Sequence, residues 1–406
     1  MTYDDCLTYL FAQLPAYQRT GKAAYKADLS NIIHLMELLG NPHKQFKTIH
    51  IAGTNGKGST AHMLAAIFQQ AGYKTGLYTS PHLTDFRERI KINGEMIPHQ
   101  YVVDFVQNQK HEVEHIAPSF FEWTVALCFD YFKSEQVDIA IIETGMGGRL
   151  DSTNVITPEL SVITNIGLDH TQFLGNTIEA IAVEKAGIIK SEVPVVLGEM
   201  LPEAEETILK IARNKKAPVS FAKDYTTLPL PQTDLESPFT TQNLKTVLTA
   251  FGVLTKKFDK LNTRDLNAAL KNAAKMTGLR GRLQILTENP LTIADVAHNK
   301  EGLELSFKYL RETTQGKLHI VFGTVNDKDL TRLLPVFLPE AHYYLCAPAI
   351  PRALNAGELE KFFTKNGFNA TRYNSVKSAY RAANQNAAER DTIYAGGSTF
   401  VVAEIL

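Results

Sequence analysis

Short, nearly continuous apolar runs alternate with helix-like segments through much of this chain. Lys47–Ala52, Val137–Ile142 and Leu160–Ile166 are rich in β-branched residues, and each runs into a loop that contains glycine or aspartate. Strands that are apolar on both faces are typical of a parallel sheet covered by helices on either side. In such sheets, ligands bind at the carboxyl ends of the strands, where these loops begin. The pattern therefore predicts an α/β fold with its functional residues along one edge of the sheet.

A second series of apolar runs begins after Thr277–Leu283, whose two glycines and two arginines predict a bend between domains. The alternation of the first series is expected to end after about Leu201. Residues 222–241 are predicted as loops or irregular strands, and the segments after them as helices. Those helices are expected at Asn243–Phe258 and Thr263–Met276, and the strands of the second series at Leu291–Ala294, Leu318–Phe322, His342–Cys346 and Thr392–Ala395. We expect two domains, residues 1–284 and residues 285–406, the second being smaller and Rossmann-like.

The composition argues against several classes of protein. Lys and Arg number 42 against 43 Asp and Glu, so there is no basic excess for binding a nucleic-acid backbone. Three cysteines that lie far apart exclude a disulfide framework and favour a reducing compartment. Asp4 and Asp5 occupy the place where a signal peptide carries positive charge, and no apolar stretch approaches the ~20 residues of a membrane span. We expect a cytoplasmic monomer with no nucleic-acid or membrane partner.

One glycine-rich loop has the chemistry of a phosphate site. It joins the expected strand Lys47–Ala52 to an expected helix over Ser59–Gln70, and its sequence is Gly53-Thr54-Asn55-Gly56-Lys57-Gly58-Ser59-Thr60. Glycines let backbone N–H groups approach phosphate oxygens, Lys57 supplies mobile positive charge, and the Ser59 hydroxyl can reach Mg²⁺. A helix-capping turn with a solvated lysine is the plainer alternative, but strand, glycines, lysine and hydroxyls all agree on phosphate. The first domain is predicted to be a P-loop-type parallel-sheet ATPase domain.

The spacing of this loop differs from the usual P-loop, because Gly58 separates Lys57 from Ser59. In this it resembles the ATP loop of the folylpolyglutamate synthases and dihydrofolate synthases and, more distantly, that of the Mur peptidoglycan ligases. Other segments resemble signatures of the folate enzymes, namely Tyr78–Leu83, Phe121–Thr124, Glu143–Asn154, Leu168–His170, Glu184–Lys190 and Asp295–Asn299. The resemblance departs most at Gln18–Asp28, near where selectivity for the pteridine is expected.

The resemblance implies ATP and two Mg²⁺ ions, and it assigns the metal shell to Ser59, Ser80, Glu143, His170 and Lys185. From the residues alone, Glu143 at the end of an apolar strand could equally be a loop hydrogen bonder, and a lone His170 is more often structural. Beside a nucleotide loop on a neighbouring strand, the magnesium role becomes the better interpretation of Glu143.

Lys185 differs from the other metal candidates because it is a cation. It follows Ile178 by seven residues and Ile181 by four, so it falls on the buried face of the helix expected after Thr177. Burial lowers the pKa of an amine, and a neutral amine can react with carbon dioxide to form an anionic carbamate. Helix geometry alone would favour a lysine that snorkels or pairs with an acid. The resemblance instead implies a carbamylated Lys185 beside the second metal.

The resemblance assigns further residues to the nucleotide and the substrates. Asn243, Arg282 and Asp295 would contact the nucleotide, and Asp295 and His298 would act from the second domain around the reacting phosphate. A polar turn is the plainer interpretation of that Asp–His pair. Phe121, Glu122 and Asp151 would lie on the substrate side, and Ser398 at the glutamate end.

The function implied is that of an ATP-dependent ligase that joins L-glutamate to tetrahydrofolate through an acyl phosphate, with dihydropteroate left open as a second acceptor. Domain closure about a hinge near Gly278–Gly281 is expected to exclude water. A Mur-type ligase acting on a UDP-sugar is one alternative, although Gly53 lies too early for the UDP-binding domain those enzymes carry. A nucleotide switch without ligase activity is another, but it leaves Asp295 and His298 unexplained.

One basic pattern has a structural interpretation only. Arg87, Arg89 and Lys91 alternate within Asp85–Ile92 and would share one side of a strand, where they could attract carboxylates. We expect a solvated strand face.

Overall fold

The computed structural model describes residues 1–12, 28–235, 237, 239–326 and 328–406, so that all but the last residue of Gln18–Asp28 lies outside the described part. By its contacts the chain forms two compact units. The N-terminal unit comprises Met1–His82, Phe86–Asp234 and Thr241–Leu279, and the C-terminal unit comprises Leu83–Asp85, Leu235–Thr240 and Arg280–Leu406. The boundary expected after residue 284 coincides with the first residue of a strand, Gln284–Glu288, in the second unit.

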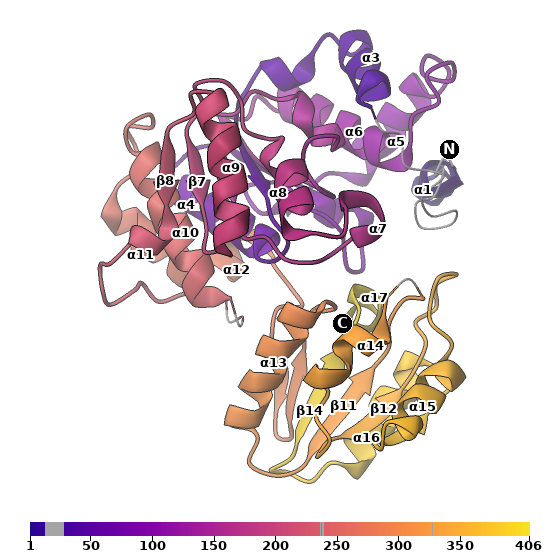
Figure 1. Cartoon of the computed structure of the whole chain (residues 1–406). Helices are drawn as coiled ribbons and strands as arrows, with labels where there is room; N and C mark the ends of the chain where they lie inside the picture. Colours follow the sequence, from indigo (N-terminus) through magenta and orange to yellow (C-terminus); the bar gives the residue numbers. More distant parts are fainter. Residues whose placement is uncertain (13–27, 236, 238, 327) are drawn as a thin grey trace. The chain divides into compact units, whose positions relative to one another are not determined.

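The N-terminal unit contains a mainly parallel sheet (Figure 1). Its strand order is β4-β3-β2-β5-β1-β6-β7-β8, and β3 pairs antiparallel with both of its neighbours, β2 and β4. The bounds are β1 Lys47–Ala52, β2 Thr75–Tyr78, β3 Ile90–Ile92, β4 Glu95–Met96, β5 Ile139–Glu143, β6 Leu160–Ile163, β7 Val195–Leu197 and β8 Val219–Phe221. The parallel α/β fold expected from the sequence is therefore confirmed.

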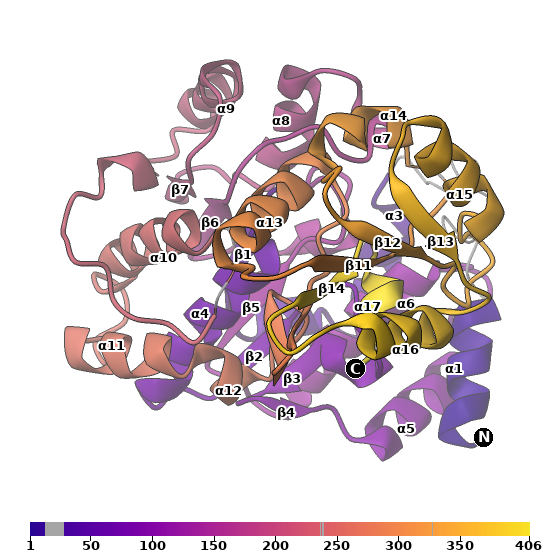
Figure 2. The same cartoon turned by 90° about the horizontal axis from the view of Figure 1, so that it is seen from below.

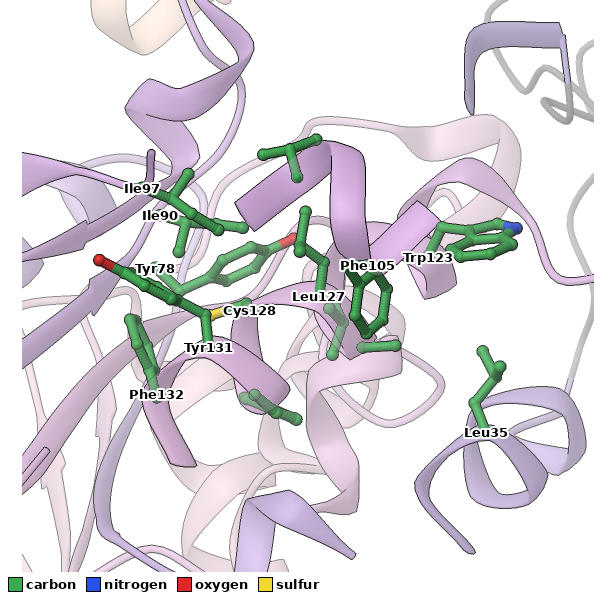
Figure 3. Packing of buried hydrophobic residues seen from close by; sticks show 14 of the residues in the cluster. Leu35, Tyr78, Ile90, Ile97, Phe105, Trp123, Leu127, Cys128, Tyr131 and Phe132 are labelled. Carbon is green, nitrogen blue, oxygen red and sulfur yellow. The ribbon is translucent and has the colours of Figure 1, made fainter. Parts of the chain in front are cut away.

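Helices cover both faces of this sheet. Ala140 and Ile142 of β5 belong to an apolar cluster with α5 and α6, and Figure 3 shows Phe105 and Leu127 of that cluster. Ile139 and Ile141 of β5 are equally buried, and α4 contacts the same strand. The helices of the unit are α1 Tyr3–Ala12, α3 Ser30–Leu38, α4 Lys57–Gln70, α5 His99–Gln109, α6 Phe120–Ser134, α7 Thr171–Leu174, α8 Ile178–Ala186, α9 Pro202–Asn214, α10 Thr240–Leu254, α11 Thr263–Lys271 and α12 Ala273–Thr277.

The expectation that the α/β rhythm lapses after Leu201 is wrong. Helix α9 follows directly, and β8 continues the parallel sheet by pairing with β7. Most residues of α9 are charged or polar, and only a narrow stripe through Ala204, Ile208 and Ala212 is buried. Because that stripe repeats every four residues among glutamates and lysines, the segment lacks the continuous apolar runs by which the other elements were identified.

The solvated strand face expected at Arg87, Arg89 and Lys91 is also wrong. Phe86–Arg89 forms a 3-10 turn and only Ile90–Ile92 is a strand. Both Arg89 and Lys91 are buried: the Arg89 Nε donates to His82 Nδ1 at 2.8 Å, and the Lys91 Nζ donates to the Thr277 carbonyl oxygen at 2.8 Å. These basic groups bind neighbouring segments of the fold rather than water.

The C-terminal unit has its own mixed sheet with the order β13-β12-β11-β14-β10-β9 (Figure 2). Only β9 is antiparallel, and neither β9 nor β13 was expected from the sequence. The strands are β9 Gln284–Glu288, β10 Leu291–Ala294, β11 Leu318–Phe322, β12 His342–Leu345, β13 Asn369–Arg372 and β14 Thr392–Gly396, and the helices are α13 Lys300–Thr313, α14 Leu330–Leu333, α15 Ala356–Lys365, α16 Val376–Asn386 and α17 Thr399–Ala403. One apolar cluster joins the sheet to α13 and α15, and another joins it to α16.

In the described part of the chain, the helices are all too short or too polar to cross a membrane.

An aromatic group on α15 provides a test of the second core. Phe363 is fully buried, with its ring centroid 4.7 Å from those of Phe337 and Tyr343, whereas the adjacent Phe362 is only partly buried. Phe363→Ala should lower the free energy of unfolding by about 3–5 kcal/mol, because it removes a buried ring and leaves a cavity. Phe362→Ala, the matched control, should cost about 1 kcal/mol. Urea unfolding followed by circular dichroism measures both, and equal losses would contradict this packing.

Candidate active site

Four neighbouring strands of the N-terminal unit end at the same edge of the sheet. In the order β2-β5-β1-β6 they are parallel, so their carboxyl ends lie side by side. Ser80 follows β2, Glu143 ends β5, the loop Gly53–Gly56 follows β1, and the segment to His170 follows β6. Residues from separate parts of the chain are thus collected where a doubly wound sheet binds its ligands.

The loop after β1 has the backbone that a phosphate site needs. Gly56 has φ +83° and caps α4, which begins with Lys57, Gly58, Ser59 and Thr60. A Cβ at Gly56 would lie 2.2 Å from the Asn243 Oδ1, and one at Gly53 would lie 1.9 Å from the Thr164 Oγ1. Glycine at both positions therefore permits close approach as well as turning, and it leaves the first N–H groups of α4 open to an anion.

The segment after β6 holds this loop in place. The Thr54 hydroxyl accepts from the Gly167 N–H at 2.9 Å and donates to the Gly167 carbonyl oxygen at 3.1 Å. The Asn55 N–H donates to the Asn165 Oδ1 at 2.7 Å, and the Thr164 hydroxyl donates to the Asn55 carbonyl oxygen at 2.6 Å. These bonds fix the loop conformation without occupying the N–H groups at the start of α4.

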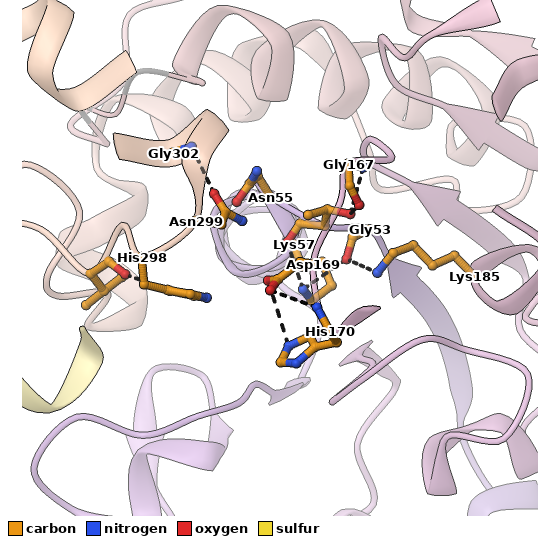
Figure 4. A network of polar contacts seen from close by, with 12 residues as sticks. Gly53, Asn55, Lys57, Gly167, Asp169, His170, Lys185, His298, Asn299 and Gly302 are labelled. Carbon is orange, nitrogen blue, oxygen red and sulfur yellow. Dashed lines mark hydrogen bonds and ion pairs between the residues drawn. The ribbon is translucent and has the colours of Figure 1, made fainter. Parts of the chain in front are cut away.

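Two lysines donate to a single backbone oxygen of this loop (Figure 4). The Nζ of Lys57 lies 3.0 Å from the Gly53 carbonyl oxygen, and the Nζ of Lys185 lies 2.8 Å from the same atom. Burial and, to a lesser extent, the nearby charge of Lys57 together lower the pKa of Lys185 to about 7, against weaker opposing effects of Asp169 and Asp151. The predicted burial of Lys185 is confirmed, and at pH 8 most of this amine is neutral.

Some buried polar atoms around the loop have no hydrogen-bond partner in the described part of the chain. They include the Asn243 Nδ2 on α10 and the Thr60 Oγ1 on α4. Leaving such groups unsatisfied costs roughly 1–3 kcal/mol each. Since Asn243 also lies against Gly56, its amide is a donor at the edge of the loop. This orphaned donor and the glycine cradle fit a nucleotide phosphate.

Glu143 and Ser80 are brought together by neighbouring strands. The Glu143 carboxylate is buried, and its Oε2 accepts from the Ser80 N–H at 3.2 Å. Among the described residues there is no group of three or more His, Cys, Asp or Glu side chains that could hold a metal ion. One carboxylate with hydroxyls, and with phosphate oxygens completing the shell, is the donor set that Mg²⁺ prefers in nucleotide sites, so Glu143, Ser59 and Ser80 fit that ion.

His170 occupies a turn rather than a regular element. Its φ is +50°, it caps the short helix α7, and its Nε2 lies 3.8 Å from the Asp169 Oδ2. Its side chain is about one third exposed. A left-handed conformation at a non-glycine residue needs a supporting environment, which makes the position a candidate for function.

The three substrate candidates differ in what they touch. The Phe121 ring packs on Gly145, since a Cβ there would come within 2.5 Å of it. Glu122 forms a capping box at the start of α6, accepting from the Ser119 N–H at 2.6 Å. Asp151 is buried and accepts from the Gly145 and Met146 N–H groups at 2.8 and 2.9 Å. Two of the three thus have structural partners within the chain.

The candidates of the C-terminal unit cluster at the ends of β10 and β14. Asp295 is buried and its Oδ2 accepts from the Ser306 hydroxyl at 2.6 Å. Burial raises the pKa of this carboxyl, while the Ser306 hydrogen bond and the Arg282 charge oppose the rise. The His298 Nδ1 donates to the Val296 carbonyl oxygen at 3.0 Å, and Ser398 caps α17 through a bond from the Phe400 N–H.

Sequence reasoning missed Thr164, Asn165 and Ser306. The first two fix the phosphate loop from β6, and the third orients the Asp295 carboxylate from α13. Polar residues directly after an apolar strand were the available signal for Thr164 and Asn165. Ser306 gave only a weak signal, because a small hydroxyl residue on a helix resembles many solvent-facing positions.

Comparison with known proteins agrees with this geometry. Residues 51–244 match the family model of the Mur ligase middle domain, and residues 281–399 match the Mur ligase, glutamate ligase domain. The folylpolyglutamate synthase of Lacticaseibacillus casei is 34% identical over 386 residues, which is 87% of either chain. The dihydrofolate synthase/folylpolyglutamate synthase of Bacillus subtilis is 34% identical, covering 88% of either chain.

Solved structures show the same likeness. A complex of Escherichia coli FolC with DHPP and ADP has a TM-score of 0.85 at 30% identity, covering 100% of this chain and 97% of that one. A bifunctional folylpolyglutamate synthase/dihydrofolate synthase with Mn, AMPPNP and L-glutamate bound has a TM-score of 0.86 at 30% identity, with the same coverage.

The glycines allow a matched test of the loop. Gly56 and Gly72 have φ of +83° and +80°, but nothing lies within 4 Å of a Cβ at Gly72. Alanine at either position should cost about 1–2 kcal/mol of backbone strain. Only Gly56→Ala should also weaken ADP binding, by at least about tenfold, because its methyl displaces Asn243. Isothermal titration calorimetry measures this, and equal affinities of the two variants would argue against the site.

Proposed function

Because this chain belongs to the folylpolyglutamate synthase/dihydrofolate synthase family of Mur ligases, we propose that the loop Gly53–Thr60 binds the ATP phosphates and that Lys57 and Lys185 act at the transferred group. The chain is an ATP-dependent ligase that joins L-glutamate to a folate carboxylate. The observation that carries the residue roles is the pair of lysines on the Gly53 carbonyl, beside a helix N-terminus and the orphaned Asn243 amide.

The reaction has two steps that balance without a further reactant. A folate carboxylate oxygen bonds to the γ-phosphorus of ATP while the bond from that phosphorus to the bridging oxygen breaks, which gives an acyl phosphate and ADP. The amine of L-glutamate then bonds to the acyl carbon, the C–O bond to phosphate breaks, and the amine nitrogen loses a proton. Activation is needed because a carboxylate is a poor electrophile.

Lys57 and the α4 N-terminus would carry the electrostatics of the first step. The Lys57 ammonium and the first N–H groups of α4 oppose the negative charge on the phosphoryl oxygens throughout transfer. Asn243 would donate its amide N–H to the nucleotide from the N-terminal domain. In the C-terminal domain, Asp295, His298 and Arg282 would serve the nucleotide and the reacting phosphate, and Ser398 the glutamate.

A divalent metal belongs to this activity, and we assign two Mg²⁺ ions to it. Ser59, Ser80 and Glu143 would hold the first, and His170 and Lys185 would contribute to the second. When bound, such ions neutralise charge on the phosphates and polarise the transferred group. Phe121, Glu122 and Asp151 form the folate side of the site, Glu122 by fixing the start of α6.

Lys185 would bind metal as a carbamate. The ammonium first loses one proton, and the neutral Nζ then bonds to the carbon of CO₂ and releases a second, so that two protons are lost in converting the cation into an anion. The depressed pKa of about 7 supports this, because a neutral amine is available at the pH of the cytoplasm. The protein acts there as a monomer on dihydropteroate, tetrahydrofolate or both.

The first test is ATP-dependent incorporation of labelled L-glutamate, with dihydropteroate and tetrahydrofolate assayed side by side and ADP release followed. Product from tetrahydrofolate alone would identify a polyglutamylating enzyme, and product from both a bifunctional one. Lys57→Ala should lower kcat by at least about 1,000-fold, because the charge it supplies acts on the transition state. Absence of either product from wild-type protein that binds ADP would overturn the assignment.

Lys185 has a direct spectroscopic test. In ¹³C-bicarbonate, wild-type protein should give a carbamate carbon resonance that grows from pH 6 to pH 8, since the neutral fraction of an amine with pKa about 7 rises through this range. Lys185→Met should lose the resonance. Lys190→Met should keep it, because Lys190, a partly buried lysine whose pKa burial also lowers, donates to the Asn154 carbonyl oxygen and not to the phosphate loop. An active wild-type enzyme without this signal would exclude the carbamate.

A further inference from the structure

A histidine lies inside the strand that leads to the phosphate loop. His50 is fully buried in β1, three residues before Gly53, among the apolar residues Ile49, Ile51 and Ala52. Its Nε2 lies 2.8 Å from the Thr153 Oγ1, on the 3-10 turn Ser152–Val155. Burying an imidazole in a sheet costs free energy that an aliphatic residue would not, so its retention needs a reason.

The direction of each hydrogen bond in this contact follows from counting protons. The Thr153 hydroxyl has one proton, and it donates that proton to the Asp151 Oδ1 at 2.5 Å. It must therefore accept from His50, which places the imidazole proton on Nε2. The Nδ1 is then a bare acceptor, and it has no hydrogen-bond partner in the described part of the chain. Burial lowers the pKa of His50 to about 3, so the ring is neutral at physiological pH.

Asp151, the next residue in this hydrogen-bond network, uses all the acceptor positions of its carboxylate within the chain. Its Oδ1 accepts from the Thr153 N–H at 3.0 Å and from the Thr153 hydroxyl, and its Oδ2 accepts from the Gly145 and Met146 N–H groups. A carboxylate offers about four acceptor positions. All four are filled from within the chain, and every neighbour is a donor, which suits the ionised form.

The hydrogen-bond network that begins at His50 ends at the loop that follows β5. The two N–H groups that Asp151 accepts come two and three residues after Glu143, and Gly145 supports the Phe121 ring. At the near end, His50 is aligned with Ile142 across the β1–β5 pairing. The hydrogen bonds thus join the strand of the phosphate loop to the backbone beside the metal candidate and the folate-side aromatic ring.

We propose that His50 and Thr153 are positioning residues for the ligase reaction, which hold Asp151 so that it fixes the Gly145–Met146 backbone between Glu143 and Phe121. Asp151 is then a scaffold for the folate side of the site. This inference rests on the proposed function, because the reaction gives the fixed loop its purpose. Mutation of residues that orient the groups of a metal or substrate site typically lowers activity by about 10–100-fold.

Nearly isosteric substitutions separate the hydrogen bond from the packing. His50→Met removes the donor, whereas His50→Gln restores an N–H donor near the position of Nε2. Thr153→Val removes the hydroxyl and keeps the shape, and Thr153→Ser restores it. His43→Met is the control, since His43 is another buried histidine, packs near Phe129 and lies outside this network. Each variant would be assayed for kcat, KM for tetrahydrofolate and ADP affinity, with its folded fraction determined by circular dichroism.

The expected result is a loss in kcat/KM for tetrahydrofolate of about 10–100-fold in His50→Met and Thr153→Val, with ADP affinity unchanged within about threefold. His50→Gln and Thr153→Ser should recover to within about fivefold of wild type, and His43→Met should match wild type. The double variant His50→Met/Thr153→Val should be no worse than either single one, because both break the same connection.

Three results would overturn the inference. Equal activity of His50→Met and His50→Gln would show that the donor is irrelevant, and additive losses in the double variant would show that the two residues act separately. Failure of both His50→Met and Thr153→Val to fold would assign the network to stability alone. A wild-type protein without ligase activity is a different outcome, since it overturns the proposed function itself.

Discussion

The parallel pairing of β1 with β5 on one side and β6 on the other determines where the candidate groups of the N-terminal domain lie. Each strand delivers its next residues to the same edge, so the phosphate loop, Glu143 and the Thr164–Gly167 segment become neighbours although the chain separates them by tens of residues. The β1 loop is then stabilised by bonds from β6, and the end of β5 by the N–H group of Ser80 after β2. Without this register the same side chains would be scattered.

The buried polar groups at this edge of the sheet are of two kinds, those with unpartnered atoms and those whose hydrogen bonds are all made within the protein. Asn243 and Thr60 have buried atoms left without partners in the described part of the chain, as the proposed ligand-binding role requires. Asp151 is the opposite case, because its acceptor positions are all satisfied from within the protein. Burial alone therefore does not distinguish a ligand-binding residue from a supporting one.

Much of this arrangement could be predicted from the sequence. The apolar runs identified β1, β5 and β6, the glycine loop indicated the candidate phosphate site, and helical spacing placed Lys185 on a buried face. Helix α9 was missed because its buried residues are few and set among charged ones, and strands β8 and β13 were missed because they are short and contain no fully buried residue. Such elements are formed by the neighbours they pack against, and a single sequence does not reveal those neighbours.

The side-chain partners were harder to predict than the elements. The burial of Arg89 and Lys91 depends on His82 and on the end of α12, which is almost two hundred residues away from Lys91. Likewise, the role of Thr153 depends on which strand His50 occupies in the sheet. Local pattern gives the face on which a residue lies, whereas its hydrogen-bond partner is set by strand order and register.

Lys57 and Lys185 both donate to the Gly53 carbonyl oxygen, so the charge of Lys57 affects the protonation of Lys185. We therefore expect phosphate binding at Lys57 to change the number of protons bound at Lys185. The pKa of Lys185 is depressed by burial and also by the Lys57 charge, so an anion that neutralises Lys57 lets that pKa rise again. Above pH 7, a free Lys185 amine will therefore take up a proton as the phosphate arrives. The heat of nucleotide binding is then expected to vary with the ionisation enthalpy of the buffer.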